Sequence, residues 1–150
     1  MDYSLILCDT ALNSGNTICL TADGLSMWPV ITGGMKAEIA PLASGAPEKG
    51  SLILTSKDGG LVVHRCWGVT CQDGVTLVVT KGDTNLGFDA PVTIDKVLGK
   101  VVCLRNRHDA VRDPNRGFLR FFGLVICASG LTARIWARIC RVLLRLMGRL

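Results

Sequence analysis

The stretch that decides the fold is residues 51–66, which reads S-L-I-L-T-S-K-D-G-G-L-V-V-H-R-C. It contains two runs of apolar and β-branched residues, Ser51–Thr55 and Leu61–Cys66. Asp58-Gly59-Gly60 stands between them, and glycine readily adopts the positive φ angles of a tight hairpin turn. The stretch therefore predicts two antiparallel strands joined by a short turn.

The same pattern extends outward on both sides of this hairpin. Gly and Asp clusters such as Asp73-Gly74 separate further short apolar runs. These runs are Thr17–Ala22, Ala37–Ala40, Val75–Thr80 and Val97–Leu104. Several short strands with turn residues between them are typical of an all-β barrel or a coiled sheet. We therefore predict one mainly β domain over residues 1–104, built as a coiled antiparallel sheet or partly open barrel.

The composition fits a single globular domain. The chain has 150 residues, of which 49% are hydrophobic and 19% are charged, so a disordered, charge-rich protein is excluded. Its seven cysteines form no Cys-x-x-Cys pair, which favours reduced thiols in a cytosolic setting over a zinc site or a disulfide framework. A Cys66–Cys71 disulfide is the remaining alternative. We expect no metal and no cofactor.

The positive charge is concentrated in the last third of the chain. Residues 1–104 carry six Lys, one Arg and ten acidic residues, whereas residues 105–150 carry ten Arg, two Asp and no Lys. A polar linker is predicted over residues 105–117, where Pro114 and Gly117 argue against one continuous helix. His108 in that linker is expected at the surface. A basic, apolar, helical tail is predicted over residues 118–150.

The tail has the pattern of two helices. Phe118–Ala128 is mostly apolar, Ser129-Gly130 interrupts it, and a second helix is predicted from Thr132 to Met147. The arginines of the second helix recur every three or four residues and therefore share one face. We expect this helix to lie in a membrane interface, through Trp136, Arg134, Arg138, Arg141 and Arg145.

Three alternatives for the tail are weighed beside this one. The first is a helix packed on the β domain with its arginines outward. The second is nucleic-acid binding, which is disfavoured because no recognised fold or aromatic–basic pattern accompanies the charge. The third is a membrane span, for which the longest uncharged stretch, Phe121–Ala133, is too short.

Three segments carry candidate catalytic side chains. They are Gly24-Leu25-Ser26-Met27-Trp28-Pro29, Val62-Val63-His64-Arg65 and Lys81-Gly82-Asp83-Thr84-Asn85, the last followed by Asp89. A serine nucleophile needs a base within hydrogen-bond reach and a group that orients the base. One Ser, one strand His and one Asp could meet that need. Spacing alone is weak evidence, because a strand His is more often structural and a Gly-Asp pair more often a turn. Arg65 also stands in one of these segments, and the alternative to a functional role for it is that of a solvated or salt-bridged strand residue.

These three segments, in this order, resemble the type I signal peptidase superfamily of serine proteases. The Ser-Met-x-Pro, His-Arg and Lys-Gly-Asp-x-Asn…Asp boxes are most similar to the branch of the endoplasmic reticulum, archaea and some spore-forming bacteria, in which a His serves as the base. The Gly-x-Ser-Met form at residues 24–27 also resembles the self-cleaving SOS repressors. The resemblance covers roughly residues 19–104 and implies a coiled sheet of the signal-peptidase type.

The resemblance implies a role for each matching residue. Ser26 matches the nucleophile, His64 the general base and Asp89 the acid that orients the base, while Asp83 matches a nearby supporting acid. Gly24 stands where family members often carry a hydroxyl, so we expect an oxyanion hole made by backbone groups or by a donor from elsewhere. The residues that frame the loop or shape the serine turn are Lys81, Gly82, Asn85, Met27 and Pro29. Ordinary core and turn packing is the alternative reading of the last two.

The resemblance also implies where a substrate lies. In this family the substrate adds as an extended strand beside the nucleophile, with small residues at the first and third positions before the cut. The residues expected to line this groove are Leu20, Thr21, Ala22, Asp23, Leu61, Val62 and Val63.

The predicted function is limited proteolysis of a precursor or leader peptide by a serine endopeptidase. Gly33-Gly34-Met35 replaces the Gly-Asp that usually follows the serine box, and no transmembrane anchor is seen before Ser26. We therefore expect a cytoplasmic enzyme, peripheral on the inner face of the cytoplasmic membrane. The first alternative is a non-catalytic peptide-binding or regulatory module on the same fold. The second is an autoproteolytic repressor, which His64 and the short N-terminal segment disfavour.

Overall fold

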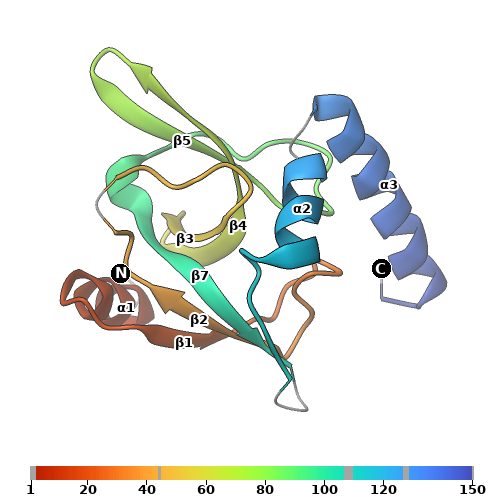
Figure 1. Cartoon of the computed structure of the whole chain (residues 1–150), viewed down its shortest axis with the longest axis horizontal. Coiled ribbons are helices and arrows are strands. Elements are labelled where there is room, and N and C mark those ends of the chain that lie inside the picture. Colours follow the sequence, from red (N-terminus) through yellow and green to blue (C-terminus); the bar gives the residue numbers. More distant parts are fainter. Residues whose placement is uncertain (1–2, 44, 107–109, 127–128, 150) are drawn as a thin grey trace.

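The computed structural model describes residues 3–43, 45–106, 110–126 and 129–149. A β-sheet forms its centre, with one helix at the N-terminus and two at the C-terminus (Figure 1). The elements are α1 (Tyr3–Asn13), β1 (Ile18–Thr21), β2 (Lys36–Ala40), β3 (Leu52–Lys57), β4 (Gly60–Gln72), β5 (Val75–Lys81), β6 (Val92–Thr93), the 3-10 helix η1 (Ile94–Lys96), β7 (Val97–Arg105), β8 (Val111–Arg112), α2 (Gly117–Ile126) and α3 (Gly130–Leu146). The predicted mainly β fold with helices at its C-terminal end is confirmed.

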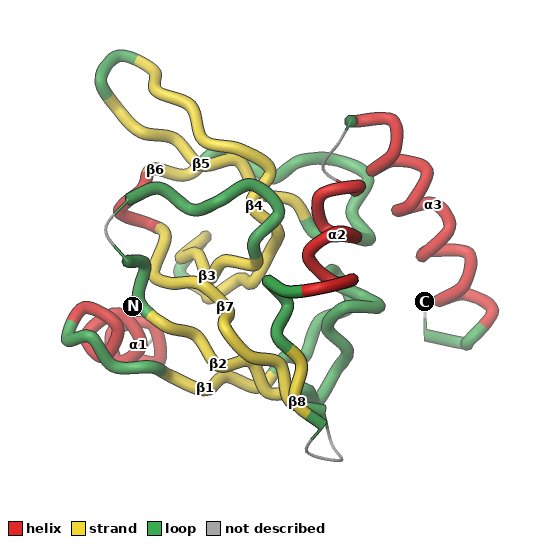
Figure 2. The backbone as a smooth tube through the Cα atoms, viewed as in Figure 1, coloured by secondary structure: helices red, strands yellow, loops and turns green. Residues whose placement is uncertain are grey.

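The strands form one antiparallel sheet that does not close. Their order is β1-β2-β7-β3-β4-β5-β6, and β8 pairs with β7 (Figure 2). The first part of β4 pairs with β3, and its continuation from Arg65 pairs with β5. One long strand therefore joins the two halves of the sheet, and His64 lies next to the point where its partner changes.

Both predicted hairpin turns are present. Asp58 and Gly59 connect β3 to β4 with φ angles of 50° and 80°, and Asp73 and Gly74 connect β4 to β5 with 51° and 77°. Two successive positive φ angles define the type I′ turn, whose twist matches that of the flanking strands. The turn residues read from the sequence therefore set the register of both hairpins.

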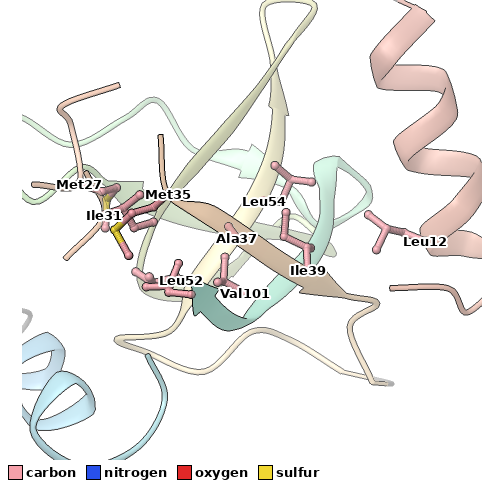
Figure 3. Packing of buried hydrophobic residues seen from close by; sticks show 10 residues of the cluster. Leu12, Met27, Ile31, Met35, Ala37, Ile39, Leu52, Leu54 and Val101 are labelled. Carbon is pink, nitrogen blue, oxygen red and sulfur yellow. The ribbon is translucent and has the colours of Figure 1, made fainter. Parts of the chain in front are cut away.

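The main hydrophobic core lies between the strands and the segment that carries Ser26. It contains Leu12, Met27, Ile31, Met35, Ala37, Ile39, Leu52, Leu54, Val101 and Leu104 (Figure 3). Gly99 lets β7 approach β2 closely, because a Cβ there would lie 2.6 Å from the carbonyl oxygen of Ala40. Burial of this cluster ties α1 and the serine turn to the sheet.

Two parts of the structure differ from the sequence-based expectations. Residues 3–13 form α1, where strands and turns were expected; the helix buries only Cys8 and Leu12, so its hydrophobic periodicity is weak. The predicted linker over 105–117 is partly sheet, because β7 continues to Arg105 and β8 pairs with it. His108 lies outside the described residues. The six cysteines within the described residues are free thiols, Cys66 and Cys71 among them.

Candidate active site

The side chains of Ser26, His64 and Asp89 form a hydrogen-bonded chain with His64 in the middle. Nε2 of His64 is 3.0 Å from Oγ of Ser26, and Nδ1 of the same ring is 2.6 Å from Oδ2 of Asp89. Ser26 belongs to the turn after β1, His64 to β4, and Asp89 to the loop between β5 and β6. A hydroxyl, an imidazole and a carboxylate in this order form the nucleophile, base and orienting acid of serine hydrolases.

The carboxylate of Asp89 is held from several sides. Oγ1 of Thr80 donates to Oδ2 at 2.8 Å, Nζ of Lys57 lies 3.5 Å from Oδ1, and the backbone N–H of Asp89 donates to the carbonyl of Thr80 at 2.9 Å. Burial raises the pKa of Asp89, but the hydrogen bonds from His64 and Thr80 and the charges of His64 and Lys57 outweigh it, so the pKa lies below its ordinary value. Asp89 is therefore kept as an anion beside the imidazole.

The serine turn is fixed by the loop after β5. The backbone N–H of Thr84 donates to the carbonyl of Ser26 at 2.9 Å, and Oγ1 of Thr84 donates to that of Leu25 at 3.1 Å. Gly82 is required at this crossing, because a Cβ would lie 2.9 Å from the Ser26 carbonyl oxygen and 2.8 Å from Nδ2 of Asn85. Thr84 has no assigned role in the sequence-based site, since hydroxyl-to-backbone contacts between distant segments leave no local pattern.

Asp83 forms a buried ion pair with Arg65. Nε and Nη2 of Arg65 donate to the two carboxylate oxygens at 2.9 and 2.7 Å, and Nη1 donates to the Gly50 carbonyl at 2.8 Å. Both side chains are at most 2% exposed. Arg65 is thus a salt-bridged strand residue, which was one of the alternatives weighed for it. It directly follows His64 in β4, and its ion pair ties this strand to the loop that holds the serine turn.

The remaining framing residues are placed as follows. Met27 is buried in the main core, which fits the ordinary packing role weighed for it (Figure 3). Pro29 is exposed and follows Trp28 through a cis peptide bond. Lys81 is buried, and its Nζ donates to the carbonyl of Gly82 at 3.2 Å.

A cleft of about 600 Å³ opens beside Ser26. All seven residues expected to line a groove border it: Leu20, Thr21, Ala22, Asp23, Leu61, Val62 and Val63. Ser4 of α1, which the sequence reading did not include, also borders it. Within the described residues, β1 pairs on one side with β2, and residues 60–64 of β4 pair on one side with β3. The cleft therefore lies between two strand edges whose other side carries no strand in the described part of the chain.

A second cavity of about 620 Å³ adjoins the serine turn. Asp23 borders both cavities, and Leu25, Asn106 and Arg149 are among the residues that line the second one. Gly33-Gly34-Met35, which departs from the pattern of the family that the sequence resembles, also lines it. This departure therefore lines a different cavity from the cleft that Ser26 borders.

The C-terminal helix α3 packs directly on the segments that carry the site. Sγ of Cys140 lies 3.8 Å from the carbonyl oxygen of Trp28, and Nε of Arg141 donates to the carbonyl of Thr84 at 3.3 Å. Burial and the nearby Asp83 raise the pKa of the Cys140 thiol to about 11, against the opposing effect of Lys81. One face of α3 thus packs on the β domain, as the packed-helix alternative for the tail predicted.

The residues expected to face a membrane have two different surroundings. The four arginines, Arg134, Arg138, Arg141 and Arg145, are exposed. Trp136 is half-buried, its ring meets that of Phe122 edge-to-face at 4.8 Å, and its Nε1 is buried without a hydrogen-bond partner in the described part of the chain. Trp136 thus packs between α2 and α3. Among the described helices no single one is long and apolar enough to cross a membrane, although the pair α2 and α3, bent at 112°, reaches that length and composition together.

No family model matches the sequence, and the comparison with curated proteins finds no match either. A function for the site therefore rests on its geometry and on the motifs that carry its residues. Across residues 3–43, 45–106, 110–126 and 129–149, no group of three or more His, Cys, Asp and Glu side chains is arranged to hold a metal ion.

Proposed function

We propose that the protein is a serine endopeptidase of the signal-peptidase type, which cleaves a precursor or leader peptide by limited proteolysis. The observation that carries the proposal is the pair of contacts at His64, 3.0 Å to Ser26 Oγ and 2.6 Å to Asp89 Oδ2. These residues come from three separate segments whose sequences resemble one family in the same order. The proposal includes the finer fold assignment, a coiled sheet of the signal-peptidase type.

The proposed reaction uses only these side chains and water. Nε2 of His64 accepts the hydroxyl proton of Ser26 while Oγ attacks the carbonyl carbon of the substrate. The anionic Asp89 stabilises the imidazolium through its contact with Nδ1. His64 then gives the proton to the leaving amine, the C–N bond breaks and an acyl-enzyme ester forms. Water, activated by His64, hydrolyses the ester and restores the Ser26 hydroxyl.

The negative charge that develops on the substrate oxygen needs preorganised donors. We assign the backbone N–H of Ser26 as one of them. A Cβ on Gly24 would lie 3.9 Å from Ser26 Oγ and 4.0 Å from Ser26 N, so position 24 borders the place where this charge forms. Because Gly24 has no side chain, the proposed hole is made by backbone groups or includes a donor from another segment.

The cleft supports a peptide as the substrate. An extended peptide can add to an exposed strand edge through backbone hydrogen bonds while pockets select alternate side chains. Two such edges, those of β1 and of residues 60–64, border the cleft that contains Ser26. A peptide inserted between them would bring one of its carbonyl groups to Ser26.

A non-catalytic peptide-binding module is the second candidate. The same cleft favours it, because strand addition does not require a working nucleophile. The 3.0 Å contact between Ser26 and His64 favours the enzyme, since a binding module has no need for this contact. The peptidase is therefore the preferred proposal.

The test is cleavage of a peptide library by the full-length chain, read by mass spectrometry. The variants Ser26→Ala and His64→Ala are expected to lose all cuts, a decrease of at least about a thousandfold. Matched controls are Ser14→Ala, at an exposed serine just after α1, and His108→Ala, at the other histidine of the chain. Cuts that persist in both active-site variants would contradict the proposal. Peptide binding without cleavage by the unaltered chain would favour the binding module.

A further inference from the structure

Helix α3 has two apolar faces, of which the protein covers one. The covered face consists of Ala133, Ala137, Cys140 and Leu144, spaced four, three and four residues apart and at most 1% exposed. Three of these side chains are small or compact, which brings the helix close to the serine turn and to Thr84. This face accounts for the packing of α3 on the β domain.

The second apolar face points away from the domain. It consists of Leu131, Ile135, Ile139, Val142 and Leu146, spaced four, four, three and four residues apart. At about 100° per residue these positions lie on the side of the helix opposite the covered face. Their side chains are between 44% and 79% exposed. A monomeric soluble protein does not normally keep such a continuous apolar row in water.

An arginine stripe runs between the two faces. Arg134, Arg138, Arg141 and Arg145 follow the same three- and four-residue spacing and are exposed. Residues 117–149 contain six arginines and no acidic residue. The exposed apolar row is therefore bordered by positive charge that no carboxylate on α2 or α3 compensates.

Helix α2 lies beside α3 and adds to this surface (Figure 1). Phe122 and Trp136 hold the two helices together edge-to-face. On α2 itself, Phe118 and Phe121 are exposed by 75% and 64%. The helical pair thus presents large aromatic and aliphatic side chains together with a one-signed charge.

We propose that the outer face of α3, with its arginine stripe, is a docking surface for an anionic lipid bilayer. The apolar row would enter the boundary between headgroups and acyl chains, and the arginines would lie at the level of the phosphates. A second copy of the chain is a poorer occupant, because it would add its own arginine stripe to the same interface, and α2 and α3 carry no carboxylate to offset that charge. Nucleic acid would match the charge and leave the apolar row in water. The negatively charged cytoplasmic leaflet meets both requirements.

This docking would place the candidate active site at the membrane surface. Only the thickness of α3, about 10 Å, separates the proposed bilayer from the carbonyls of Trp28 and Thr84, which α3 contacts. Where the proposed peptidase function holds, its substrates would be precursors presented at the bilayer. The docking surface itself does not depend on that function, because none of its residues belongs to the Ser26–His64–Asp89 set.

The experiment is flotation of the full-length chain with vesicles. We expect binding to vesicles of phosphatidylcholine mixed with phosphatidylglycerol, and weak binding to vesicles of phosphatidylcholine alone. The triple variant Arg134→Gln, Arg138→Gln and Arg145→Gln is expected to bind about a hundredfold more weakly. The double variant Ile135→Ser and Val142→Ser is expected to lose binding as well, while both variants keep the thermal transition of the unaltered chain. Ser26→Ala should bind like the unaltered chain, which separates docking from catalysis.

The matched control removes the same charge from exposed positions outside α2 and α3, as Lys96→Gln, Arg112→Gln and Arg116→Gln. It is expected to keep vesicle binding. Equal weakening of this control would overturn the proposal, because net charge rather than a defined face would then be responsible. Failure of the unaltered chain to float would overturn it too. So would a dimer in lipid-free solution that the Ile135→Ser and Val142→Ser changes dissociate, since a second copy would then occupy the face.

Discussion

Nζ of Lys57 lies 3.5 Å from Oδ1 of Asp89, while His64 and Thr80 both contact Oδ2 of the same carboxylate. A lysine at the end of β3 thus supports the acid that orients the proposed base. Burial acts against the charged carboxylate, and these donors and charges reverse that effect, so the pKa of Asp89 lies below its ordinary value. The arrangement links the charge state of the site to the stability of the fold.

The depressed pKa of Asp89 predicts a pH-dependent stability. Because the folded state binds this proton less readily than the unfolded state, Asp89 contributes stability above its unfolded pKa of about 3.9 that is lost as the pH falls through the folded value. Asp89→Asn should therefore flatten the fall in the free energy of unfolding as the pH decreases below about 5. Lys57→Met should give an intermediate slope. Urea unfolding at several pH values measures both.

The exposed Asp95→Asn variant is the matched control for these slopes. It is expected to leave the pH dependence close to that of the unaltered chain. An unchanged slope in Asp89→Asn would mean that the contacts of this carboxylate do not favour its charged form in the folded state.

The buried ion pair of Arg65 and Asp83 predicts that removing one partner lowers the free energy of unfolding more than removing both. Asp83→Leu leaves a guanidinium without its carboxylate at a site that is at most 2% exposed, so we expect a loss of about 3–5 kcal/mol. The double variant Arg65→Met with Asp83→Leu removes both charges and should be less destabilised than Asp83→Leu alone. Denaturant unfolding of the unaltered chain, the single variants Asp83→Leu and Arg65→Met, and the double variant tests this order. A double variant that loses the sum of the two single effects would show that the pair does not act as a unit.

The sequence predicted the hairpins of the fold because their signals are local. Asp58-Gly59 and Asp73-Gly74 carry their backbone preference within two residues, and each stands where the structure has a type I′ turn. By contrast, α1 is set by tertiary packing: it is held by the burial of Cys8 and Leu12 against the sheet, which no short-range pattern encodes. The pairing of β8 with β7 is not predicted from the sequence either, because a strand of two residues is too short for a periodic signal.

The residues around the candidate site divide in the same way. Ser26, His64 and Asp89 were selected through motifs, and their side chains meet. Thr84 and Lys57 were missed, because each acts through one contact with a residue distant in sequence. The arginine periodicity of the tail revealed an amphipathic helix, yet it did not reveal that Cys140 and Arg141 contact the segments of the site.

At Gly123, helix α2 approaches the ion pair of Arg65 and Asp83 so closely that no side chain fits. A Cβ at this position would meet the guanidinium of Arg65 and would lie 3.1 Å from the carbonyl oxygen of Gly50. Gly123→Ala is therefore expected to destabilise the chain by about 1–3 kcal/mol, as overpacking of a close contact does. Gly130→Ala is the control in the same pair of helices, because its Cβ meets nothing within 4 Å and alanine favours helix. Thermal unfolding should show a lower transition temperature for Gly123→Ala and not for Gly130→Ala.

Gly24 predicts a gain of activity, which is the least expected outcome of a substitution next to a nucleophile. Its φ is not in the left-handed region, and the nearest atom to an added Cβ is Ser26 Oγ at 3.9 Å, so a side chain fits. Gly24→Ser would supply a hydroxyl donor near the developing oxyanion, where the signal peptidases that this segment resembles often carry one. Since loss of one such donor lowers kcat by about 100–1,000-fold, the added donor should raise kcat of the proposed peptidase by up to about tenfold, with little change in KM. Gly24→Ala controls for the added bulk and should leave kcat unchanged. Equal kcat values for the Ser and Ala variants would mean that the oxyanion is already satisfied by donors other than a side chain at position 24.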